Sequence, residues 1–121
     1  MRWHPANMNA LGLRLVLVLA AGCTNGETRA GTVGDGKELY AKLCATCHGA
    51  TGRPDATMAA RLGVRDLTSP ELRARMTPLL VENQIRAGSP NKLMPAFAGA
   101  LSDAQIKAIA GYVADPSFVS R

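Results

Sequence analysis

Aromatic side chains are scarce in this 121-residue sequence: they make up 4% of it, and the one tryptophan, Trp3, lies close to the N-terminus. Because so short a chain with few large rings builds only a thin core, a bulky apolar cofactor would help it to fold. The sequence also shows no apolar–polar alternation longer than a few residues, and no internal repeat. These absences argue against a β-sheet or a repeat protein, and they predict one small all-α domain.

Clusters of basic residues are also missing. The formal net charge is +5, and removal of a leader that contains Arg2 and Arg14 would bring it to about +3. The other basic residues are scattered along the chain, so the charge does not indicate a nucleic-acid-binding protein. A mildly basic surface is enough to explain it.

No apolar run is long enough to span a bilayer. Residues 1–22 have the features of a signal peptide, because a positively charged flank precedes a short apolar run over residues 15–21. That run falls well below the roughly 20 residues that a transmembrane helix needs. We therefore expect an exported protein.

The predicted signal peptide leads into Ala20-Ala21-Gly22-Cys23, which resembles a lipoprotein box. In such a box small residues precede a cysteine that is lipidated, so we expect Cys23 to be a lipid anchor that holds the protein to a membrane. Ala20 stands where leucine is commonest, and ordinary cleavage nearby, which would leave Cys23 as a free thiol or remove it, stays an alternative. Residues 23–34 are polar and glycine-rich, which predicts a flexible tether.

Helix start and stop signals divide the predicted domain, residues 35–115, into four or five short helices. Asp35, Ser69, Thr77 and Ser102 are typical N-cap residues, and proline follows two of them at the first helical position. We expect helices over residues 36–44, 57–62, from 70 onward, 79–87 and 103–114. The loops between them are long for so small a domain unless they wrap a cofactor. Residues 116–121 follow an Asp-Pro stop signal and are predicted to be a C-terminal tail.

The strongest chemical signal is the motif Cys44-Ala45-Thr46-Cys47-His48. Two cysteines three apart on a helix face the same way, so each sulfur can form a thioether with one vinyl group along a haem edge. The residue that follows then places an imidazole beneath the iron. The motif predicts one covalently attached haem c on Cys44 and Cys47, with His48 as an iron ligand.

Other uses of these cysteines are weaker hypotheses. A thioredoxin-like redox pair needs a preceding strand and a βαβ context, which the sequence lacks. A tetrahedral zinc site needs four ligands, and His4 is the only other histidine. A disulfide between residues 44 and 47 would be short and strained. With three cysteines in an exported chain, at least one thiol has a use other than a disulfide.

A second iron ligand would have to be a methionine, because the other histidine lies in the leader. Of Met58, Met76 and Met94, the last is favoured, since Pro95 keeps it on a loop from which its side chain can fold over the haem. Met76 is interpreted as packing, and Met58 would matter only if its loop doubles back; any of the three could instead fill the core. Ligation by histidine and methionine saturates the iron, which favours electron transfer over oxygen or peroxide chemistry.

At these residues the sequence resembles class I cytochrome c in its short bacterial form, over about residues 34–115. The resemblance implies the cytochrome c fold, in which short helices wrap around one covalent haem. It also implies that Gly36 and Tyr40 on the first helix meet Ile109 and Tyr112 on the last, with an Ala-Gly pair between them that allows the backbones to approach closely.

Two further segments, Asp66–Ser69 and Met94–Phe97, are similar to the family, and the second supports Met94 as the axial ligand. Other features depart from the family pattern. The family usually has a proline whose carbonyl accepts the hydrogen bond from Nδ1 of the haem histidine, but only Pro54 lies near. We expect a backbone carbonyl between Gly52 and Ala60 to take that role.

The domain has no tryptophan to bond a haem propionate. Arg61, Arg65 and Lys92 are candidate replacements, although a plain surface charge is the simpler interpretation of each.

Together these features predict an extracytoplasmic one-electron carrier, not an enzyme, with His48/Met94 ligation and redox proteins as partners. It would work on the periplasmic side of a bacterial membrane, anchored by lipid at Cys23 or otherwise soluble in the periplasm, as a monomer or a complex subunit. Two alternatives stay open: a catalytic or ligand-sensing haem protein with an open sixth position, and a fixed cytochrome subunit of a larger oxidoreductase complex.

Overall fold

The computed structural model describes residues 34–120, so the predicted signal peptide, Cys23 and nearly all of the predicted tether lie outside the described residues. Within this range the chain is helical and has no strand; an isolated bridge joins Ala98 and Leu101. The prediction of an all-α fold is confirmed. In this part of the chain no helix has the length and apolar character needed to cross a bilayer.

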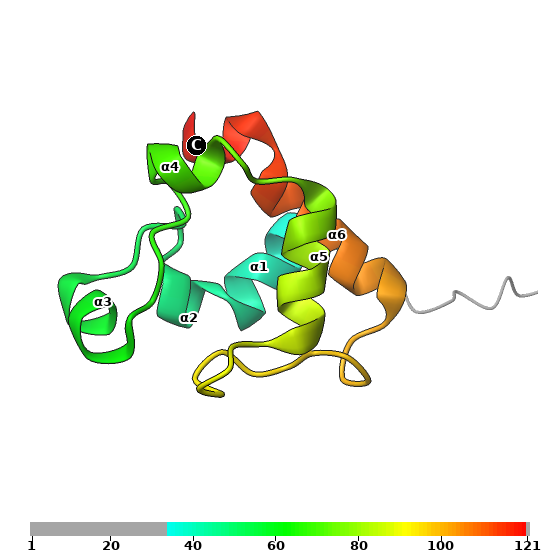
Figure 1. Ribbon diagram of the computed structural model, residues 1–121. Coiled ribbons are helices and arrows are strands. Elements are labelled where there is room, and N and C mark those ends of the chain that lie inside the picture. Colours follow the sequence, from blue (N-terminus) through cyan, green and yellow to red (C-terminus); the bar gives the residue numbers. More distant parts are fainter. Residues whose placement is uncertain (1–33, 121) are drawn as a thin grey trace, which may run out of the picture.

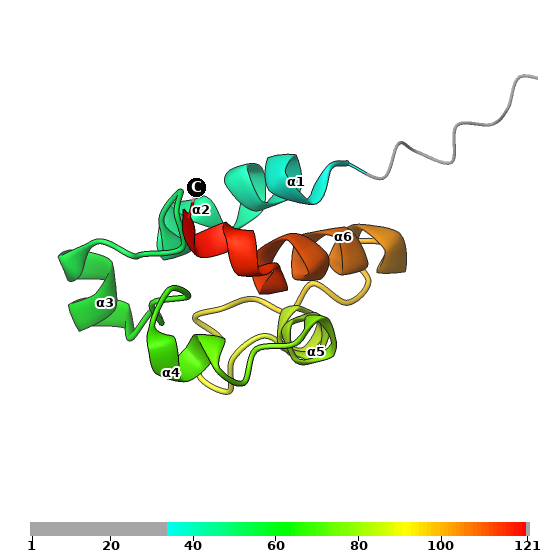
Figure 2. The ribbon, with the colours of Figure 1, turned by 90° about the horizontal axis from the view of Figure 1, so that it is seen from above.

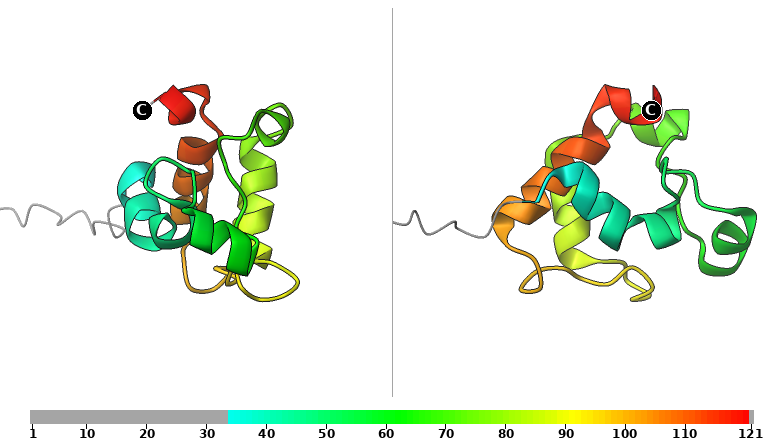
Figure 3. Two further views of the ribbon diagram at one scale, coloured as in Figure 1. Left: turned by 90° about the vertical axis from the view of Figure 1, so that its left-hand side faces the viewer. Right: turned by 180° about the vertical axis from the view of Figure 1, so that it is seen from behind.

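Six α-helices and one 3-10 helix follow one another along the described residues (Figure 1). They are α1 Gly36–Leu43, α2 Ala45–His48, α3 Ala56–Leu62, α4 Pro70–Arg73, α5 Pro78–Ala87, α6 Asp103–Ala114 and the 3-10 helix η1 Pro116–Ser120. Helix α6 packs against both α1 and α5, and α3 lies at the opposite end of the molecule (Figure 2). Figure 3 shows η1 and α4 at the same end of the molecule, where the Arg73 guanidinium of α4 lies 5.7 Å from the ring centroid of Phe118 in η1.

Capping side chains begin the helices largely where the sequence predicts. The side chains of Asp35 and Thr77 cap α1 and α5. At the start of α6, Gln105 N donates to Ser102 Oγ at 3.2 Å and Ser102 N donates to Gln105 Oε1 at 2.9 Å, which completes the predicted capping box. Helix α3 begins one residue earlier than expected because Asp55 accepts the backbone N–H of its third residue at 2.8 Å.

Helices α1 and α6 approach each other closely at Gly36. A Cβ atom there would overlap the backbone carbonyl of Ala108, so only glycine allows the two backbones to approach this closely. One turn further along α1, the ring of Tyr40 lies 5.6 Å from that of Tyr112, centroid to centroid. The implied contact between the first and last helices is therefore present. The contact does not depend on Gly111, however, because a Cβ on Gly111 would meet no atom of another described element within 4 Å.

Residues 116–120 are not a tail. Phe118 is only 2% exposed, and its ring packs edge-on against Tyr40 and Tyr112, at centroid distances of 5.4 and 5.3 Å. The Asp-Pro pair does end α6, but the chain continues as η1 and brings this ring back into the core. The folded domain therefore extends past the predicted boundary at residue 115.

Candidate functional site

The motif residues Cys44, Cys47 and His48 lie where α1 meets α2. The predicted helix through residue 44 is interrupted there, because Cys44, with φ of −115°, both ends α1 and caps α2. Its N–H donates to the carbonyl of Tyr40 at 2.9 Å, and its own carbonyl accepts from His48 N at 2.9 Å. Both thiols are half-buried and free of a disulfide bond. The structure thus keeps the three residues together on one short, hydrogen-bonded stretch.

The Cys44 thiol is unsuited to dithiol redox chemistry. Burial, with a smaller contribution from Cys47, raises the pKa of the Cys44 thiol to about 11. A reactive pair needs the opposite shift, because the thiolate is the nucleophile. The electrostatics therefore agree with the sequence in disfavouring a thioredoxin-like site. Over residues 34–120, no three His, Cys, Asp or Glu side chains gather as a cluster that could hold a metal ion.

The turn after His48 is tied to α1 through a tyrosine hydroxyl. Tyr40 Oη donates to the carbonyl of Gly49 at 2.7 Å, and burial raises the pKa of this phenol, which keeps it protonated as a donor. Gly49 has a φ of 79°, and a Cβ there would overlap the carbonyl of Arg53. Sequence analysis assigned Tyr40 to packing alone; nothing in the sequence pattern indicated its hydrogen bond.

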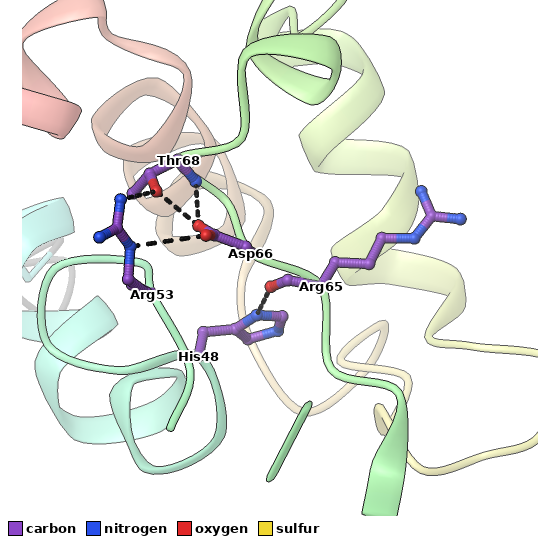
Figure 4. A network of polar contacts seen from close by, with 5 residues as sticks. All are labelled: His48, Arg53, Arg65, Asp66 and Thr68. Atoms are coloured by element: carbon purple, nitrogen blue, oxygen red, sulfur yellow. Dashed lines mark hydrogen bonds and ion pairs between the residues drawn. The ribbon is translucent and has the colours of Figure 1, made fainter. Parts of the chain in front are cut away.

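The imidazole of His48 is oriented by a backbone carbonyl (Figure 4). Its Nδ1 lies 3.3 Å from the carbonyl oxygen of Arg65. Because a carbonyl oxygen only accepts, Nδ1 carries the hydrogen and Nε2 keeps its lone pair for another partner. Burial lowers the pKa of His48, while the bond to Arg65 acts in the opposite direction. The ring is therefore presented as a neutral ligand with Nε2 available.

The expected position of this carbonyl was wrong. We expected it between Gly52 and Ala60, but it belongs to Arg65, beyond α3. The reason is tertiary: after α3 the chain doubles back along the earlier loop, and Leu67 N donates to the carbonyl of Gly52 at 2.8 Å. This return path brings residue 65 beside the histidine.

A polar network holds the segment that supplies the carbonyl (Figure 4). Asp66 Oδ1 accepts from the backbone N–H of Thr68 at 2.8 Å and from its hydroxyl at 2.5 Å. Arg53 Nη2 donates to Thr68 Oγ1 at 3.3 Å, and Arg53 Nε lies 3.5 Å from Asp66 Oδ2. The hydroxyl of Thr68 first, and then its N–H and Arg53, hold the pKa of the Asp66 carboxyl below its usual value.

Sequence analysis noted the segment Asp66–Ser69 only as similar to a family. The spacing of Asp66 and Thr68 is itself a turn signal, because an aspartate can accept the N–H two residues on. Their link to Arg53 depends on the return of the chain after α3, and no local pattern indicates it.

Met94 lies half-buried on the loop between α5 and α6 and packs against the core. Ser89 holds its backbone on both sides: Met94 N donates to Ser89 Oγ at 2.9 Å, and Ser89 N donates to the Met94 carbonyl at 3.0 Å. Gly88, with a φ of 68°, lies so close to this carbonyl that a Cβ would not fit. The loop thus gives Met94 a defined backbone position.

The other two methionines lie elsewhere. Met76 follows α4, is half-buried, and its sulfur accepts a hydrogen bond from Arg73 Nη1 at 3.0 Å, in agreement with a packing role. Met58 is half-buried in α3. The three candidates therefore differ in their surroundings: Met58 lies in α3, Met76 lies between α4 and α5 with its sulfur bonded to Arg73, and Met94 lies on the loop between α5 and α6.

Arg73 is a structural residue that sequence analysis missed. From α4, its guanidinium donates to the carbonyls of Val113 at 2.6 Å, Ala114 at 3.3 Å and Asp115 at 2.8 Å. These carbonyls lie at the C-terminal end of α6, where a positive charge is favourable. The same guanidinium lies 5.7 Å from the ring centroid of Phe118. It joins α4 to the end of α6.

The basic residues considered for the propionates, Arg61, Arg65 and Lys92, are all exposed. Figure 4 shows the side chain of Arg65 pointing away from His48. Their contact with a propionate stays a prediction.

These residues fit a covalently bound, planar apolar group. Two thiols at the attachment spacing and an imidazole with Nε2 available are the donors that a c-type haem requires for attachment. Partly exposed apolar side chains pack around the small core and would be covered by such a group. They include Leu67, Met76, Val81, Met94 and Phe97.

Comparison with known proteins gives the family. Residues 31–113 match the family model described as Cytochrome C oxidase, cbb3-type, subunit III. A protein named cytochrome c6 from Cladophora glomerata is 30% identical over 87 residues, which cover 72% of this chain and 91% of that protein. The chain belongs to the c-type cytochromes. Membership implies a covalently bound c-type haem, for which Cys44 and Cys47 are present.

A solved structure confirms the cytochrome c fold. The structure titled KustC0563 c-type cytochrome is similar with a TM-score of 0.59 and 32% identity, over 66% of this cytochrome and 94% of that chain. The dihydro-heme d1 dehydrogenase of Pseudomonas aeruginosa is 35% identical over 107 residues, which cover 88% of this cytochrome but only 19% of that protein. This cytochrome therefore spans a small part of the length of that relative.

Proposed function

We propose that this cytochrome is an extracytoplasmic one-electron carrier, with one haem c attached to Cys44 and Cys47 and with His48 and Met94 as axial ligands. The observation that carries the proposal is the orientation of His48, whose Nδ1–H bond to the Arg65 carbonyl leaves Nε2 as the ligand atom. Metal-bound histidines regularly make such a bond through their other nitrogen.

Met94 supports the same function, because its backbone is held on a loop by Ser89 while its thioether is half-buried. When bound, the haem supplies an Fe(II)/Fe(III) couple, whose potential His/Met ligation raises. The protein chain would hold His48 Nε2 and Met94 Sδ in place, and its apolar side chains would keep water away from the haem. We propose no enzymatic turnover, because two protein ligands leave no position for a substrate.

The test is a spectroelectrochemical titration of the holoprotein, made with a c-type maturation system, as wild type, Met94→Leu and Met76→Leu. Wild type and Met76→Leu should show a low-spin haem, a methionine–iron charge-transfer band and one reversible one-electron wave at positive potential. Met94→Leu should lose the band, fall in potential and bind carbon monoxide. A band that persists in Met94→Leu would remove Met94 from the iron, and a high-spin wild type would favour the catalytic or ligand-sensing hypothesis.

For the membrane we propose Cys23 as the lipid anchor, which lies outside the described residues. Detergent phase partition of wild type and Cys23→Ala, with the haem absorbance as the probe, tests this directly. Wild type should enter the detergent phase and Cys23→Ala should stay in water, and mass spectrometry of the N-terminal peptide should show two or more acyl chains. Equal partition of both into water would indicate a soluble periplasmic protein.

A fixed subunit of a larger oxidoreductase complex is the second candidate, because the matching family model describes an oxidase subunit. Leu79 and Leu80, at the start of α5, are 64% and 54% exposed and would suit burial against another subunit. Haem-stained native gels of membranes from the natural host distinguish the two. A carrier migrates alone, whereas a subunit migrates with a complex and Leu79→Lys releases it.

A further inference from the structure

We propose that Arg53, Asp66 and Thr68 are positioning residues that hold the Arg65 carbonyl against His48 and thereby set the reduction potential of the bound haem. The inference rests on the proposed function, since it takes His48 as an iron ligand.

The acceptor of the His48 bond is a backbone atom, so its position depends on what holds the backbone around it. Asp66 follows Arg65 directly, and its carboxylate accepts both the N–H and the hydroxyl of Thr68, at 2.8 and 2.5 Å. The two bonds close a tight turn immediately after the carbonyl. Rotation of the peptide unit that carries the Arg65 oxygen would have to break this turn.

Arg53 links this turn to the histidine side of the bond. It belongs to the loop that follows His48, and its backbone carbonyl lies so close to Gly49 that a Cβ there would overlap it. From there it reaches Thr68 Oγ1 at 3.3 Å and Asp66 Oδ2 at 3.5 Å. The network therefore joins the loop that follows His48 to the segment that carries the acceptor carbonyl, as Figure 4 shows.

The length of the bond makes it sensitive to this separation. At 3.3 Å, the distance from His48 Nδ1 to the Arg65 oxygen lies just beyond the usual range for an N–H···O bond. A small withdrawal of the carbonyl therefore weakens the bond appreciably. Since a bond at Nδ1 raises the basicity of the ligand nitrogen, its weakening removes electron density from the iron. Fe(III) is then less stabilised, and the potential rises.

The experiment measures the holoprotein as wild type, Asp66→Ala and Thr68→Val. At a fixed solution potential the variants should raise the ratio of Fe(II) to Fe(III) roughly 3- to 10-fold, about 30 to 60 mV for a one-electron couple, which is modest beside other outer-shell substitutions. In the diamagnetic Fe(II) form, proton NMR should show faster exchange of the His48 Nδ1 hydrogen with water. The exchange rate reports on the bond itself rather than on overall stability.

Conservative variants and a matched control distinguish positioning of the Arg65 carbonyl from a general contribution to stability. Thr68→Ser keeps the hydroxyl and should keep the wild-type potential. Asp66→Asn keeps an acceptor oxygen for Thr68 but loses the charge that faces Arg53, so its potential should be intermediate. Asp55→Ala removes a carboxylate that caps α3, at 2.8 Å from the backbone N–H of Met58. It should lower stability and leave both the potential and the Nδ1 exchange unchanged.

Two results would overturn the inference: Asp66→Ala with the potential and Nδ1 exchange of wild type, or equal shifts in Asp66→Ala and Asp55→Ala. Either would reduce the network to ordinary structural support. Failure of the proposed function is visible separately, in wild type alone, as a high-spin spectrum or the absence of the methionine–iron band.

Discussion

The two sides of this small domain are held together by different interactions. On the packed side, formed by α1, α6 and η1, the ring of Phe118 packs edge-on against the rings of Tyr40 and Tyr112, which are tilted relative to each other. Buried aliphatic side chains complete the core. The polar side, residues 49–76, contributes none of the fully buried apolar side chains of the described chain. It is held by backbone bonds, the Asp66 network and Arg73.

The two sides therefore have different expected roles: the packed side stabilises the fold, and the polar side positions the hydrogen-bond partner of His48. Apolar burial supplies most of the folding free energy, so the packed side is expected to dominate stability. Hydrogen bonds contribute little net energy each, but they fix direction. The polar side, whose hydrogen bonds fix direction, therefore carries the Arg65 carbonyl that accepts from His48.

The largest predicted effect is the loss of the Phe118 ring from the packed side. Phe118→Ala should lower the free energy of unfolding by about 3–5 kcal/mol, because it leaves a cavity beside the rings of Tyr40 and Tyr112. Urea denaturation of the holoprotein, followed by far-ultraviolet circular dichroism, measures it. Val119→Ala, at a side chain that is 47% exposed, is the control and should change stability by less than about 0.5 kcal/mol. Equal losses would mean that η1 does not belong to the core.

The second prediction contrasts two glycines on the packed side. Gly36→Ala should cost about 1–3 kcal/mol, because its Cβ would overlap the backbone of α6. Gly111→Ala, at an exposed position in the last turn of α6, should instead raise stability by about 0.5–1 kcal/mol, since alanine is the better helix former. Opposite signs in thermal denaturation would localise the close approach to Gly36; a loss at both positions would contradict it.

The third prediction concerns the junction of the two sides. Arg73→Lys should lower the free energy of unfolding by about 1–2 kcal/mol, because one ammonium group cannot replace the guanidinium on three carbonyls. Arg75→Lys, at an exposed position two residues later, is the matched control and should have no measurable effect in the same urea titration. Comparable behaviour of the two variants would show that Arg73 does not join the sides.

The smallest predicted effect belongs to the polar side and depends on pH. The folded pKa of the Asp66 carboxyl lies below its usual value, so the unfolded chain binds this proton first as pH falls. The contribution of the group is complete above about pH 4 and is lost as pH falls through the folded pKa. Because the side chain is 37% exposed, we expect less than about 1 kcal/mol.

Urea titrations of wild type and Asp66→Asn at several pH values check this. The stability difference between them should be present at pH 7 and should shrink toward zero in acid. A difference that persists at the lowest pH would assign it to packing instead of charge.

Features that depend on a few adjacent residues were predictable from the sequence. The caps at Asp35 and Ser102 place a side chain and the N–H that it binds within one turn, so their spacing alone predicts the bond. The Cys44 to His48 motif is equally local, and it led to the right family. Helix α5 begins after Thr77 and ends at Gly88 as expected, for the same reason.

Features that depend on the return of the chain were not predictable. The acceptor for His48 was sought within twelve residues of it, but the loop comes back only after α3. Phe118 follows a strong helix stop signal, and its burial is explained only by its contacts with the rings of Tyr40 and Tyr112. From the sequence, either Gly36 on α1 or Gly111 on α6 could have allowed the close approach of the two helices. The register in which the helices cross places Gly36, and not Gly111, at the contact.

The crossing of α1 and α6 also has a consequence for the order of events during biosynthesis. Gly36 and Ala108 meet although most of the domain lies between them, and contacts of such long sequence separation form late, because loop closure costs entropy before packing compensates for it. The two thiols emerge with α1, long before α6 exists to dock. During that interval they are open to attachment chemistry, and docking of α6 afterwards completes the core against which Cys44 packs.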